Sequence, residues 1–299
     1  MQAQGKGSQC NDDATVMKPL DVIGDVHGQC DKLVALLEHL GYSRSAGAYR
    51  HRSRAAVFVG DLIDRGPKQI QTVELVRAMI EAGAARCILG NHEFNAIAWM
   101  TPDTDVPGEF LRPHGKPGNF SQHRAFLEQV GEGSARHREF IAWFRTLPLW
   151  LEDPGLRVVH ACWHAESVES LRRVLGPGET LTDDLITRAS RRGTWEFAAV
   201  ETLCKGPEIE LPKGMSFADK EGKTRHEVRI RWWQEDLSTP SSDRAAGRYE
   251  DDARCTDADR VASRSLCRPA GGVRALLVQR QTGRHLAAVC LCRLQRGAR

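Results

Sequence analysis

The 299-residue sequence lacks the features that mark membrane-spanning, secreted and zinc-ribbon proteins. No segment approaches the roughly 18 apolar residues that suggest a membrane-spanning helix. The first residues, MQAQGKGSQCNDDATVMKP, contain no apolar core of the kind found in secretory signals. The nine cysteines include no Cys-x-x-Cys pair, which argues against zinc-ribbon and thioredoxin-like sites. We therefore expect a cytoplasmic protein with reduced cysteines and no membrane partner.

A strong excess of charge of one sign is also missing. The 42 Lys and Arg residues nearly balance the 39 Asp and Glu residues, and the formal net charge is +3. So small and mixed a charge gives no reason to expect nucleic acid as a partner. The contents of 41% hydrophobic and 27% charged residues are ordinary for a globular protein, and the length allows one large domain or two smaller ones.

Short apolar runs alternate with helical patterns over the first 160 residues. Four runs predict buried strands, at residues 20–24, 55–60, 86–90 and 156–160. Apolar residues recur at helical spacing after the first two runs, in segments 33–40 and 68–82, and a further helix is expected to start near Glu93. Strands that alternate with helices predict an α/β fold that holds ligands at the strand ends.

Each predicted strand runs directly into polar side chains of the types that bind metals or phosphate. The four segments read GDVHG, GDLIDRGP, GNHE and VVHA. The polar residues that they supply are Asp25, His27, Asp61, Asp64, Arg65, Asn91, His92, Glu93 and His160. A single Asp after a strand is more often a turn former or a helix cap. Four such strand ends together favour one shared site.

Carboxylate, imidazole and amide donors in this mixture suit Mn²⁺, Fe or Zn²⁺ better than Ca²⁺. About six ligands are too many for one catalytic metal with open positions, and enough for two ions bridged by a carboxylate. Two such ions would supply hydroxide at neutral pH and hold phosphoryl oxygens. Arg65 has the planar fork that grips phosphate. His92 is suited to general acid catalysis, with Asp64 holding its ring.

These motifs, in this order across roughly residues 18–165, resemble those of the calcineurin-like metallophosphoesterases. The branch that they resemble most holds serine/threonine phosphoprotein phosphatases and bacterial symmetrical diadenosine-tetraphosphate hydrolases. The resemblance implies a central β-sandwich flanked by α-helices in four layers, α/β/β/α. It also implies a hydrolase in which metal-bound hydroxide attacks phosphorus, with a phosphoprotein or a nucleotide as the phosphorylated substrate. A serine/threonine-type phosphoprotein phosphatase is the first interpretation. The alternatives are a dinucleoside-polyphosphate hydrolase and an impaired metal- or phosphate-binding module.

The resemblance implies a role for each ligand-type residue at two divalent metal ions, with Mn²⁺ expected first and Fe or Zn²⁺ as alternatives. Asp25 and His27 become ligands of the first ion. Asp61 becomes the carboxylate that bridges the two ions. Asn91 and His160 become ligands of the second ion.

The remaining motif residues would act on the substrate. His92 becomes the proton donor, Asp64 its partner and Arg65 a contact of the phosphate group. The family gives Glu93 no metal, so we expect it to supply a negative charge to the start of its helix. A second phosphate-binding Arg could come from RIRWW at 229–233, but nothing in the sequence fixes which one.

The family expects one more histidine ligand after the fourth strand, commonly in a Gly-His pair, and no such pair follows residue 233. The remaining candidates are His226 and His285. Loss of this ligand would weaken the second metal and lower activity.

Composition divides the chain into a flexible lead-in at 1–17, a catalytic domain at 18–235 and an atypical C-terminal segment at 236–299 that is partly disordered or divergent. Two explanations of residues 238–299 stay open, a divergent tail and an altered reading frame. A Pro- and Gly-rich insert at 101–123 is expected to shape the substrate site as a loop or lid. His137 reads as a surface residue, and the oligomeric state is not readable.

Overall fold

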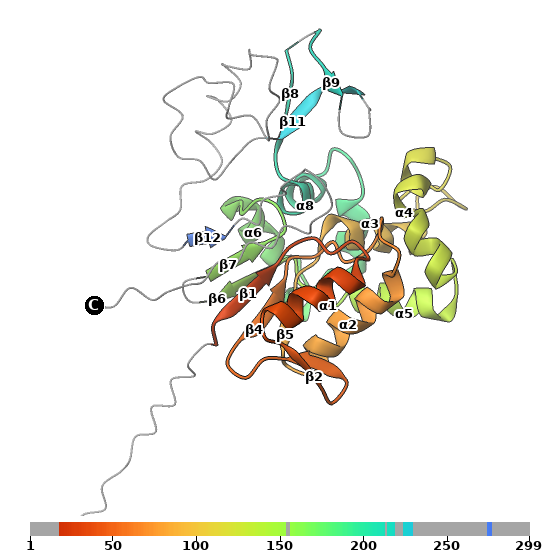
Figure 1. The fold of residues 1–299 in the computed structure, drawn as a ribbon. Coiled ribbons are helices and arrows are strands. Elements are labelled where there is room, and N and C mark those ends of the chain that lie inside the picture. The colour runs from red at the N-terminus through yellow and green to blue at the C-terminus, as the bar shows by residue number, and fades with distance from the viewer. Residues whose placement is uncertain (1–17, 154–155, 213, 219–223, 230–273, 277–299) are drawn as a thin grey trace, which may run out of the picture.

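The computed structural model describes residues 18–153, 156–212, 214–218, 224–229 and 274–276. Helices and strands alternate through most of this part of the chain (Figure 1). The strands are β1 (Leu20–Ile23), β2 (Ser43–Ser45), β3 (Ala48–Arg50), β4 (Ala55–Phe58), β5 (Ala85–Cys87), β6 (Trp150–Asp153), β7 (Leu156–Val159), β8 (Glu208–Glu210), β9 (Phe217–Ala218), β10 (Thr224–Arg225), β11 (Glu227–Arg229) and β12 (Arg274–Leu276). The helices are α1 (Cys30–His39), α2 (Gln69–Glu81), α3 (Asn91–Met100), α4 (Pro117–Val130), α5 (Ala135–Phe144), α6 (Ala165–Arg172), α7 (Asp183–Ala189) and α8 (Trp195–Lys205), with a short 3₁₀ helix at Pro177–Glu179.

Two three-stranded sheets form the centre of the fold. The first has the order β1-β4-β5, and all of its strands are parallel. The second has the order β12-β7-β6, in which β7 pairs antiparallel with β6 and parallel with β12. The parallel pairing of the first sheet brings the carboxyl ends of its three strands to one edge, where the ligand-type side chains follow.

Side chains that point inward from both sheets form a separate apolar cluster between them. Val22 of β1 and Val57 of β4 share this cluster with Leu156 and Val158 of β7. The next residues along the first two strands, Ile23 and Phe58, belong instead to the large core that includes the helices. Because successive strand side chains point to opposite faces, each sheet has one face toward the other sheet and one toward helices.

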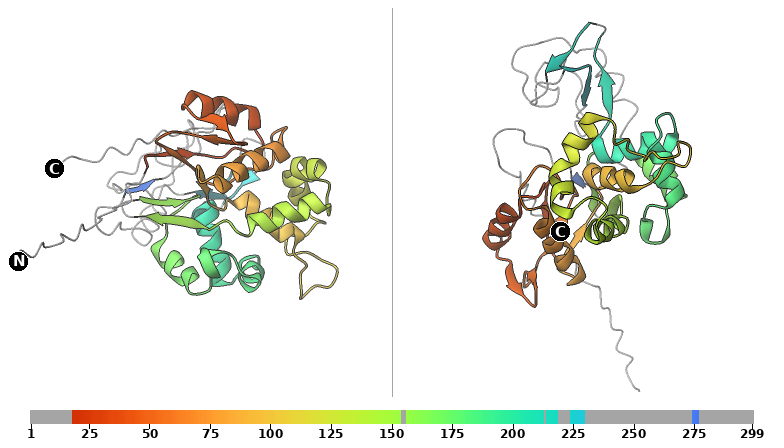
Figure 2. Two further views of the ribbon diagram at one scale, coloured as in Figure 1. Left: turned by 90° about the horizontal axis from the view of Figure 1, so that it is seen from below. Right: turned by 90° about the vertical axis from the view of Figure 1, so that its right-hand side faces the viewer.

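Helices cover the outer face of each sheet, which confirms the expected α/β/β/α sandwich. Helices α1 and α2 bury their apolar faces against the first sheet through residues such as Leu37 and Val76. On the other side, Leu171 of α6 and Leu203 of α8 join the same core as Val159. The left view of Figure 2 shows the order of layers, from the red helix α1 through the two sheets to the green and teal helices α6 to α8.

The predicted strands are confirmed to within three residues at each end. Helix α3 begins at Asn91, two residues before the expected start, because Gly90 is its extended N-cap residue. The boundary expected at residue 235 lies outside the described residues. Within the segment expected to be atypical, residues 274–276 form β12 and extend the second sheet along β7.

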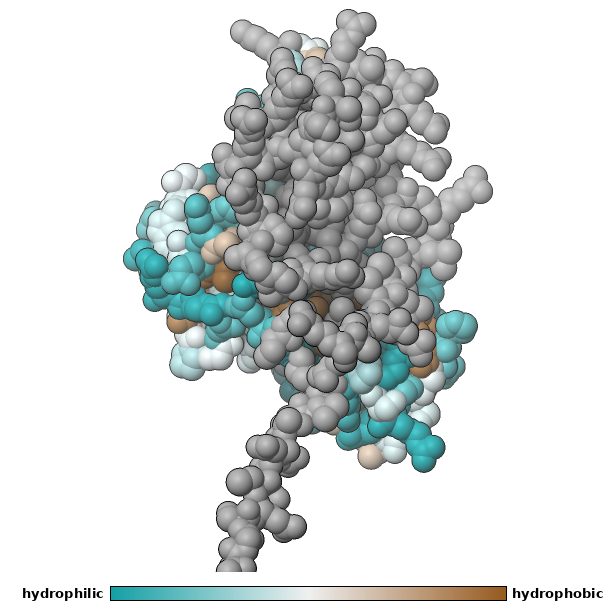
Figure 3. All heavy atoms as spheres, turned by 90° about the vertical axis from the view of Figure 1, so that its left-hand side faces the viewer, coloured by the Kyte–Doolittle hydropathy of each residue, from teal (hydrophilic) through white to brown (hydrophobic). Residues whose placement is uncertain are grey.

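No helix among the described residues is long and apolar enough to cross a membrane. On the face shown in Figure 3, the visible described residues are mainly hydrophilic, with small apolar areas between them. The cysteines of the described ranges are buried and form no disulfide with one another: Cys30, Cys87, Cys162 and Cys204. The cytoplasmic location stays a prediction.

His137 is fully buried, so the interpretation of this residue as a surface histidine is wrong. Its ring packs edge-on against Phe126, and its Nδ1 accepts the backbone N–H of Gly133 at 3.1 Å. Its Nε2 has no hydrogen-bond partner among the described residues. Burial lowers the pKa of His137 to about 4, and the charge of His123 adds to this effect. The folded protein therefore holds this imidazole neutral.

We predict that His137 makes folding less favourable as the pH falls from about 6.5 to about 4. In this window the unfolded chain binds a proton that the folded chain excludes, while above pH 6.5 neither state is protonated. The full loss is on the order of 3 kcal/mol in the free energy of unfolding. Urea unfolding at pH 7 and pH 5 should show about 2 kcal/mol of this loss, since the rest follows only below pH 5. In His137→Asn, whose amide oxygen can accept the same N–H, the decrease should be smaller; an equal decrease in both proteins would contradict the account.

Candidate metal centre

The loops after β1 and β4 are joined by backbone hydrogen bonds. The carbonyl of Asp61 accepts the N–H groups of Val26 and His27 at 3.0 and 2.9 Å. Gly28 N–H donates to the carbonyl of Leu62 at 2.7 Å, and Gly66 N–H donates to the carbonyl of His27 at 2.8 Å. The polar residues of both motifs are thus placed by one rigid network rather than by two separate loops.

Residues of the same two loops adopt backbone conformations that L-amino acids avoid. Six non-glycine residues of the described ranges have positive φ, and four of them are motif residues: His27 at 48°, Asp61 at 53°, and Asp64 and Arg65 at 71°. Each such residue costs roughly 1–2 kcal/mol. Strain of this kind persists only where the surrounding structure imposes it, and it concentrates at functional sites.

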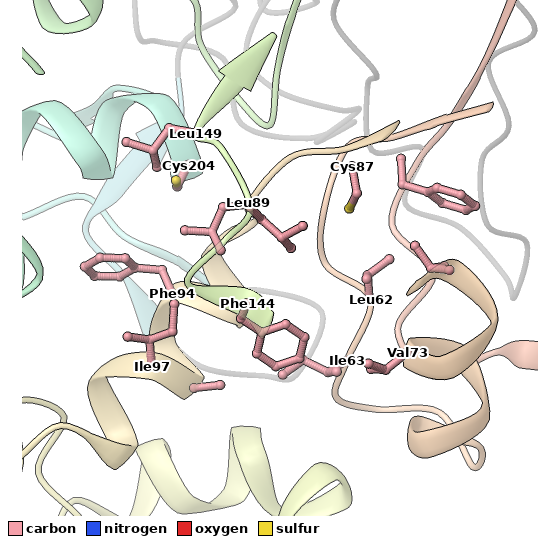
Figure 4. Packing of buried hydrophobic residues seen from close by; sticks show 14 of the residues in the cluster. Leu62, Ile63, Val73, Cys87, Leu89, Phe94, Ile97, Phe144, Leu149 and Cys204 are labelled. Carbon is pink, nitrogen blue, oxygen red and sulfur yellow. The ribbon is translucent and has the colours of Figure 1, made fainter. Parts of the chain in front are cut away.

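Apolar anchors within the second loop impose this conformation. Leu62 and Ile63, which separate the two aspartates of the motif, have no exposed surface. Figure 4 shows Ile63 beside Val73 of α2 and Leu62 within the same apolar core. Burial of these two large side chains fixes the backbone between Asp61 and Asp64.

Two glycines allow the loops after β4 and β5 to approach closely. A Cβ added to Gly60 would lie 2.3 Å from the backbone nitrogen of Gly90, and one added to Gly90 would lie 2.4 Å from that of Asp61. Gly60 also has a φ of 91°. Any side chain at either position would separate the loop that carries Asp61 from the start of α3.

The carboxylate of Asp61 lies at the centre of the convergent residues and has no exposed surface. Its Oδ1 accepts the backbone N–H of His92 at 3.1 Å. Its Oδ2 is 3.8 Å from the Nε2 atoms of both His27 and His92, and 3.5 Å from that of His160. Burial alone would raise the pKa of Asp61, but the charges of His160 and His92 outweigh it and hold the pKa well below its usual range.

His27 and His160 have the ring orientation of metal-binding histidines. The Nδ1 of His27 is 2.8 Å from the carbonyl of Ile63, and the Nδ1 of His160 is 2.6 Å from that of Val59. A carbonyl can only accept, so Nδ1 carries a proton in both rings, and Nε2 is the nitrogen that faces Asp61 and can bind a cation once it is deprotonated. The buried Nε2 of His27 has no hydrogen-bond partner among the described residues.

Five side chains form two groups that could each hold a cation, and both groups contain Asp61. The first is His27, Asp61 and His92, and the second is Asp25, Asp61 and His160, with ligand atoms within 4.8 Å of one another in each. The shared carboxylate, the oriented histidines and the unpartnered Nε2 of His27 fit a pair of divalent ions. The Oδ2 of Asp25 also lies 3.7 Å from the Nε2 of His27, so the expected assignment of these two residues to one ion stays a prediction.

The other expected site residues lie around this centre. Asn91 is the first residue of α3, next to His92, and is partly exposed. Arg65 is exposed on the strained loop, close enough for its charge to contribute to the lowered pKa of His27. Burial is the main cause of that shift, which takes the pKa of His27 to about 4.

The candidates for a late histidine ligand do not join the centre in the described part of the chain. His226 is exposed, and its Nδ1 lies 3.4 Å from the carbonyl of Met215. It belongs to neither cation-binding group. His285 lies outside the described residues.

The carboxylate of Asp64 contacts two histidines, and the sequence predicted only the contact with His92. Its Oδ2 is 2.5 Å from the Nδ1 of His92, as expected. Its Oδ1 is 2.9 Å from the Nδ1 of His123, which lies on α4 at the end of the insert. All three residues are buried. The hydrogen bonds to His123 and His92 hold the pKa of Asp64 below its usual range against the effect of burial. His123 follows a stretch without strand or motif, so no sequence pattern marked it.

Glu93 does more than supply charge to the start of α3. Its buried carboxylate accepts the backbone N–H groups of Asp61 at 2.8 Å, Leu62 at 2.7 Å and Gly90 at 3.1 Å. The bond to Gly90 caps the helix as expected, while the other two attach the loop that carries Asp61 to α3. Burial, followed by the charge of Asp61, raises the pKa of Glu93 to about 7.

Comparison with known proteins gives a consistent family. A family model described as calcineurin-like phosphoesterase matches residues 18–211. An asymmetrical bis(5'-nucleosyl)-tetraphosphatase PrpE of Halalkalibacterium halodurans is 45% identical over 208 residues, which cover 63% of this chain and 80% of that protein. The corresponding protein of Oceanobacillus iheyensis is 34% identical over 153 residues, which cover 51% of this chain and 58% of that protein.

A symmetrical bis(5'-nucleosyl)-tetraphosphatase of Aromatoleum aromaticum is 31% identical over 155 residues, which cover 50% of this chain and 48% of that protein. The chain thus spans only about half to three-fifths of the length of several of these relatives. Among solved structures, a metallophosphoesterase from Sphaerobacter thermophilus has 23% sequence identity and a TM-score of 0.31, covering 48% of this chain and 46% of that one. A TM-score this low carries no argument.

We predict that Mn²⁺ or Zn²⁺ stabilises the protein against heat, because a ligand of the folded state alone adds to the free energy of unfolding. A cation at 100 times its dissociation constant contributes about 2.7 kcal/mol, which should raise the melting temperature by roughly 5–10 °C. Differential scanning fluorimetry with and without the cation measures the shift.

Asp61→Asn should remove most of this shift, since both groups of ligands lose their common carboxylate. The matched control is Asp31→Asn, which removes an exposed carboxylate paired with Lys68 on the surface. A full shift retained by Asp61→Asn would show that the cation binds elsewhere.

Proposed function

Because the chain belongs to the calcineurin-like phosphoesterase family, we propose that it is a phosphoester hydrolase whose chemistry takes place around Asp61. The observation that carries this proposal is the pair of cation-binding groups that share the Asp61 carboxylate. A shared carboxylate is the arrangement that two-metal phosphoryl-transfer sites require.

The relatives favour a dinucleoside-polyphosphate hydrolase over a phosphoprotein phosphatase. The resemblance to phosphoprotein phosphatases put that class first, with dinucleoside-polyphosphate hydrolases as the alternative. The relatives reported above are named as bis(5'-nucleosyl)-tetraphosphatases, of both the asymmetrical and the symmetrical kind. We therefore propose that the substrate is a dinucleoside polyphosphate rather than a phosphoprotein.

Two divalent ions, with Mn²⁺ as our first choice, would be held by Asp25, His27, Asp61, Asn91 and His160. His92 is close enough to belong to the first cation-binding group, but we assign it to the substrate because its bond to the Asp64 carboxylate favours the protonated ring. When bound, such ions lower the pKa of a coordinated water and neutralise charge on phosphoryl oxygens. The chain's own contribution is orientation. The carbonyls of Ile63 and Val59 fix the rings of His27 and His160, so these side chains need not be ordered when the cations bind.

His92 supplies the proton in this proposal. Hydrolysis forms a bond between a water oxygen and phosphorus and breaks the bond from that phosphorus to the leaving oxygen, which departs with the electron pair. Because the Nδ1 of His92 is held by Asp64, the Nε2 is the atom that can give a proton to the leaving oxygen. Burial lowers the pKa of His92, but the nearby carboxylates of Asp61 and Asp64 outweigh this effect and raise it, which favours the protonated form.

His123 is a positioning residue in the same proposal. Its bond to Asp64 Oδ1 fixes the carboxylate whose other oxygen orients His92. The contact also joins α4 to the loop that carries Asp64, so movement of α4 away from this loop would remove one of the two histidine bonds that fix the Asp64 carboxylate. We assign the exposed Arg65, whose charge acts on His27, to the phosphoryl oxygens that the cations do not hold.

The experiment that tests the function is a parallel assay with Mn²⁺ on diadenosine tetraphosphate, a phosphoserine peptide and p-nitrophenyl phosphate. We expect kcat/KM for diadenosine tetraphosphate to exceed that for the peptide by at least about tenfold, which corresponds to 1.4 kcal/mol of transition-state stabilisation. A preference for the peptide would reverse the substrate assignment. Metal binding without hydrolysis of any of the three would favour the impaired binding module.

Variants of the two histidines that contact Asp64 check the assignment of residues. His92→Asn should lower kcat by roughly 10²- to 10⁴-fold with metal content unchanged. His123→Asn should lower kcat by about tenfold and leave KM nearly constant, since it acts through another residue. His39→Asn changes an exposed histidine at the end of α1 and is the matched control. An active His92→Asn enzyme would remove the proposed proton donor.

A further inference from the structure

The insert expected as a loop or lid is packed firmly against α3. The ring of His114 stacks between Trp99 and Phe110, with centroids 3.8 and 4.2 Å away. The Nε2 of His114 also lies 2.9 Å from the carbonyl of Trp99. Asp103 at the start of the insert forms an ion pair with Arg191, between α7 and α8. The insert is thus a fixed wall of the site.

This wall presents an arginine beside the proton donor. The backbone of Arg112 is fixed by its N–H bond to the carbonyl of Ala98 at 3.1 Å. Its guanidinium donates to the Oε1 of Gln122 at 2.6 Å. The amide nitrogen of Gln122 is in turn 3.4 Å from the Nε2 of His92, the atom assigned above to the leaving oxygen. A group that receives the proton from His92 therefore lies next to Gln122, with the Arg112 guanidinium bonded to the other end of the same amide.

Arg112 is a half-buried cation that forms no ion pair among the described residues. Its Nε is buried and has no hydrogen-bond partner there. Its one side-chain hydrogen bond in this part of the chain is to a neutral amide. Burial lowers the pKa of Arg112, and the more distant charges of Asp64 and Glu201 offset this only in part. A guanidinium removed from water without a carboxylate partner favours an anionic ligand.

The position of this cation distinguishes between kinds of leaving group. In a phosphomonoester, the atom next to the leaving oxygen is carbon, so Arg112 would have no anion to bind. In a dinucleoside polyphosphate, the leaving oxygen belongs to a second phosphate that carries negative charge. A planar guanidinium can bind two oxygens of such a phosphate.

We propose that Arg112, oriented by Gln122, binds the phosphate of the leaving nucleotide and so selects substrates whose leaving group is itself phosphorylated. This inference rests on the proposed function, because it places the leaving group beside His92. It assigns to the insert a specificity-determining residue that lies outside the four strand-end motifs.

The test compares Arg112→Met with the wild-type protein on diadenosine tetraphosphate and on p-nitrophenyl phosphate, both with Mn²⁺. We expect kcat/KM for diadenosine tetraphosphate to fall about tenfold or more, chiefly through KM, because a hydrogen-bonded ionic contact is lost. The fall for p-nitrophenyl phosphate should be less than about threefold. Competitive inhibition by adenosine diphosphate should weaken in parallel with the rise in KM.

The matched control is Arg124→Met on the same helix as Gln122, where the arginine is exposed and pairs with Glu128. It should leave both substrates unchanged. Arg112→Lys keeps the charge without the planar fork and should give an intermediate loss, and it replaces the methionine variant if that one does not fold. Gln122→Ala should also lower kcat/KM for diadenosine tetraphosphate more than for p-nitrophenyl phosphate.

Equal losses on the two substrates, or no loss on either, would overturn the inference, since Arg112 would then act only on the fold or not at all. Failure of the proposed function gives a different result, in which the wild-type protein itself does not hydrolyse diadenosine tetraphosphate.

Discussion

The structure depends on the way in which Asp61 is held. Its carbonyl accepts two N–H groups from the loop after β1, its own N–H donates to Glu93, and its Oδ1 accepts the N–H of His92 at the start of α3. One residue with positive φ thus joins the ends of three parallel strands. With these bonds in place, its Oδ2 faces the Nε2 atoms of three histidines that come from three different strand ends. Convergence of the centre therefore follows from the backbone geometry around a single carboxylate.

Backbone strain and a buried charge destabilise the loops of the centre, and neighbouring residues offset this cost by apolar packing and hydrogen bonds. Four strained motif residues and a buried carboxylate would destabilise an isolated loop by several kcal/mol. Leu62 and Ile63 offset part of that cost by burial in the core that α2 shares, and Glu93 satisfies three backbone donors at once. The close approach of Gly60 and Gly90 makes this possible. The centre is preorganised because its supports are apolar packing and backbone bonds, which do not depend on a bound ligand.

Sequence reasoning predicted the parts of the structure that have a local pattern. The strand runs, the helical faces of α1 and α2 and the ligand-type residues after each strand were all readable from spacing and residue type. The choice of Asp61 as the shared residue came from the family resemblance. The contacts of His123 and Glu93 were not readable, because their partners are distant in the sequence: Asp64 for His123, and Asp61 and Leu62 for Glu93. The role of Arg112 was not readable, because it is linked to His92 only through Gln122. His137 was misread as a polar surface residue, although Phe140, Ile141 and Phe144 follow it at helical spacing and mark its face of α5 as the buried one. The pairing of β12 with β7 likewise joins segments more than 100 residues apart.

The central claim is that two cations share the carboxylate of Asp61. The most direct measurement is anomalous X-ray diffraction from crystals of the protein grown with Mn²⁺, recorded at the manganese absorption edge. The account predicts two anomalous peaks separated by about 3.5–4 Å, one on each side of the Asp61 carboxylate. The first should touch His27, and the second His160. A single peak, or two peaks of which one does not contact Asp61, would contradict the account.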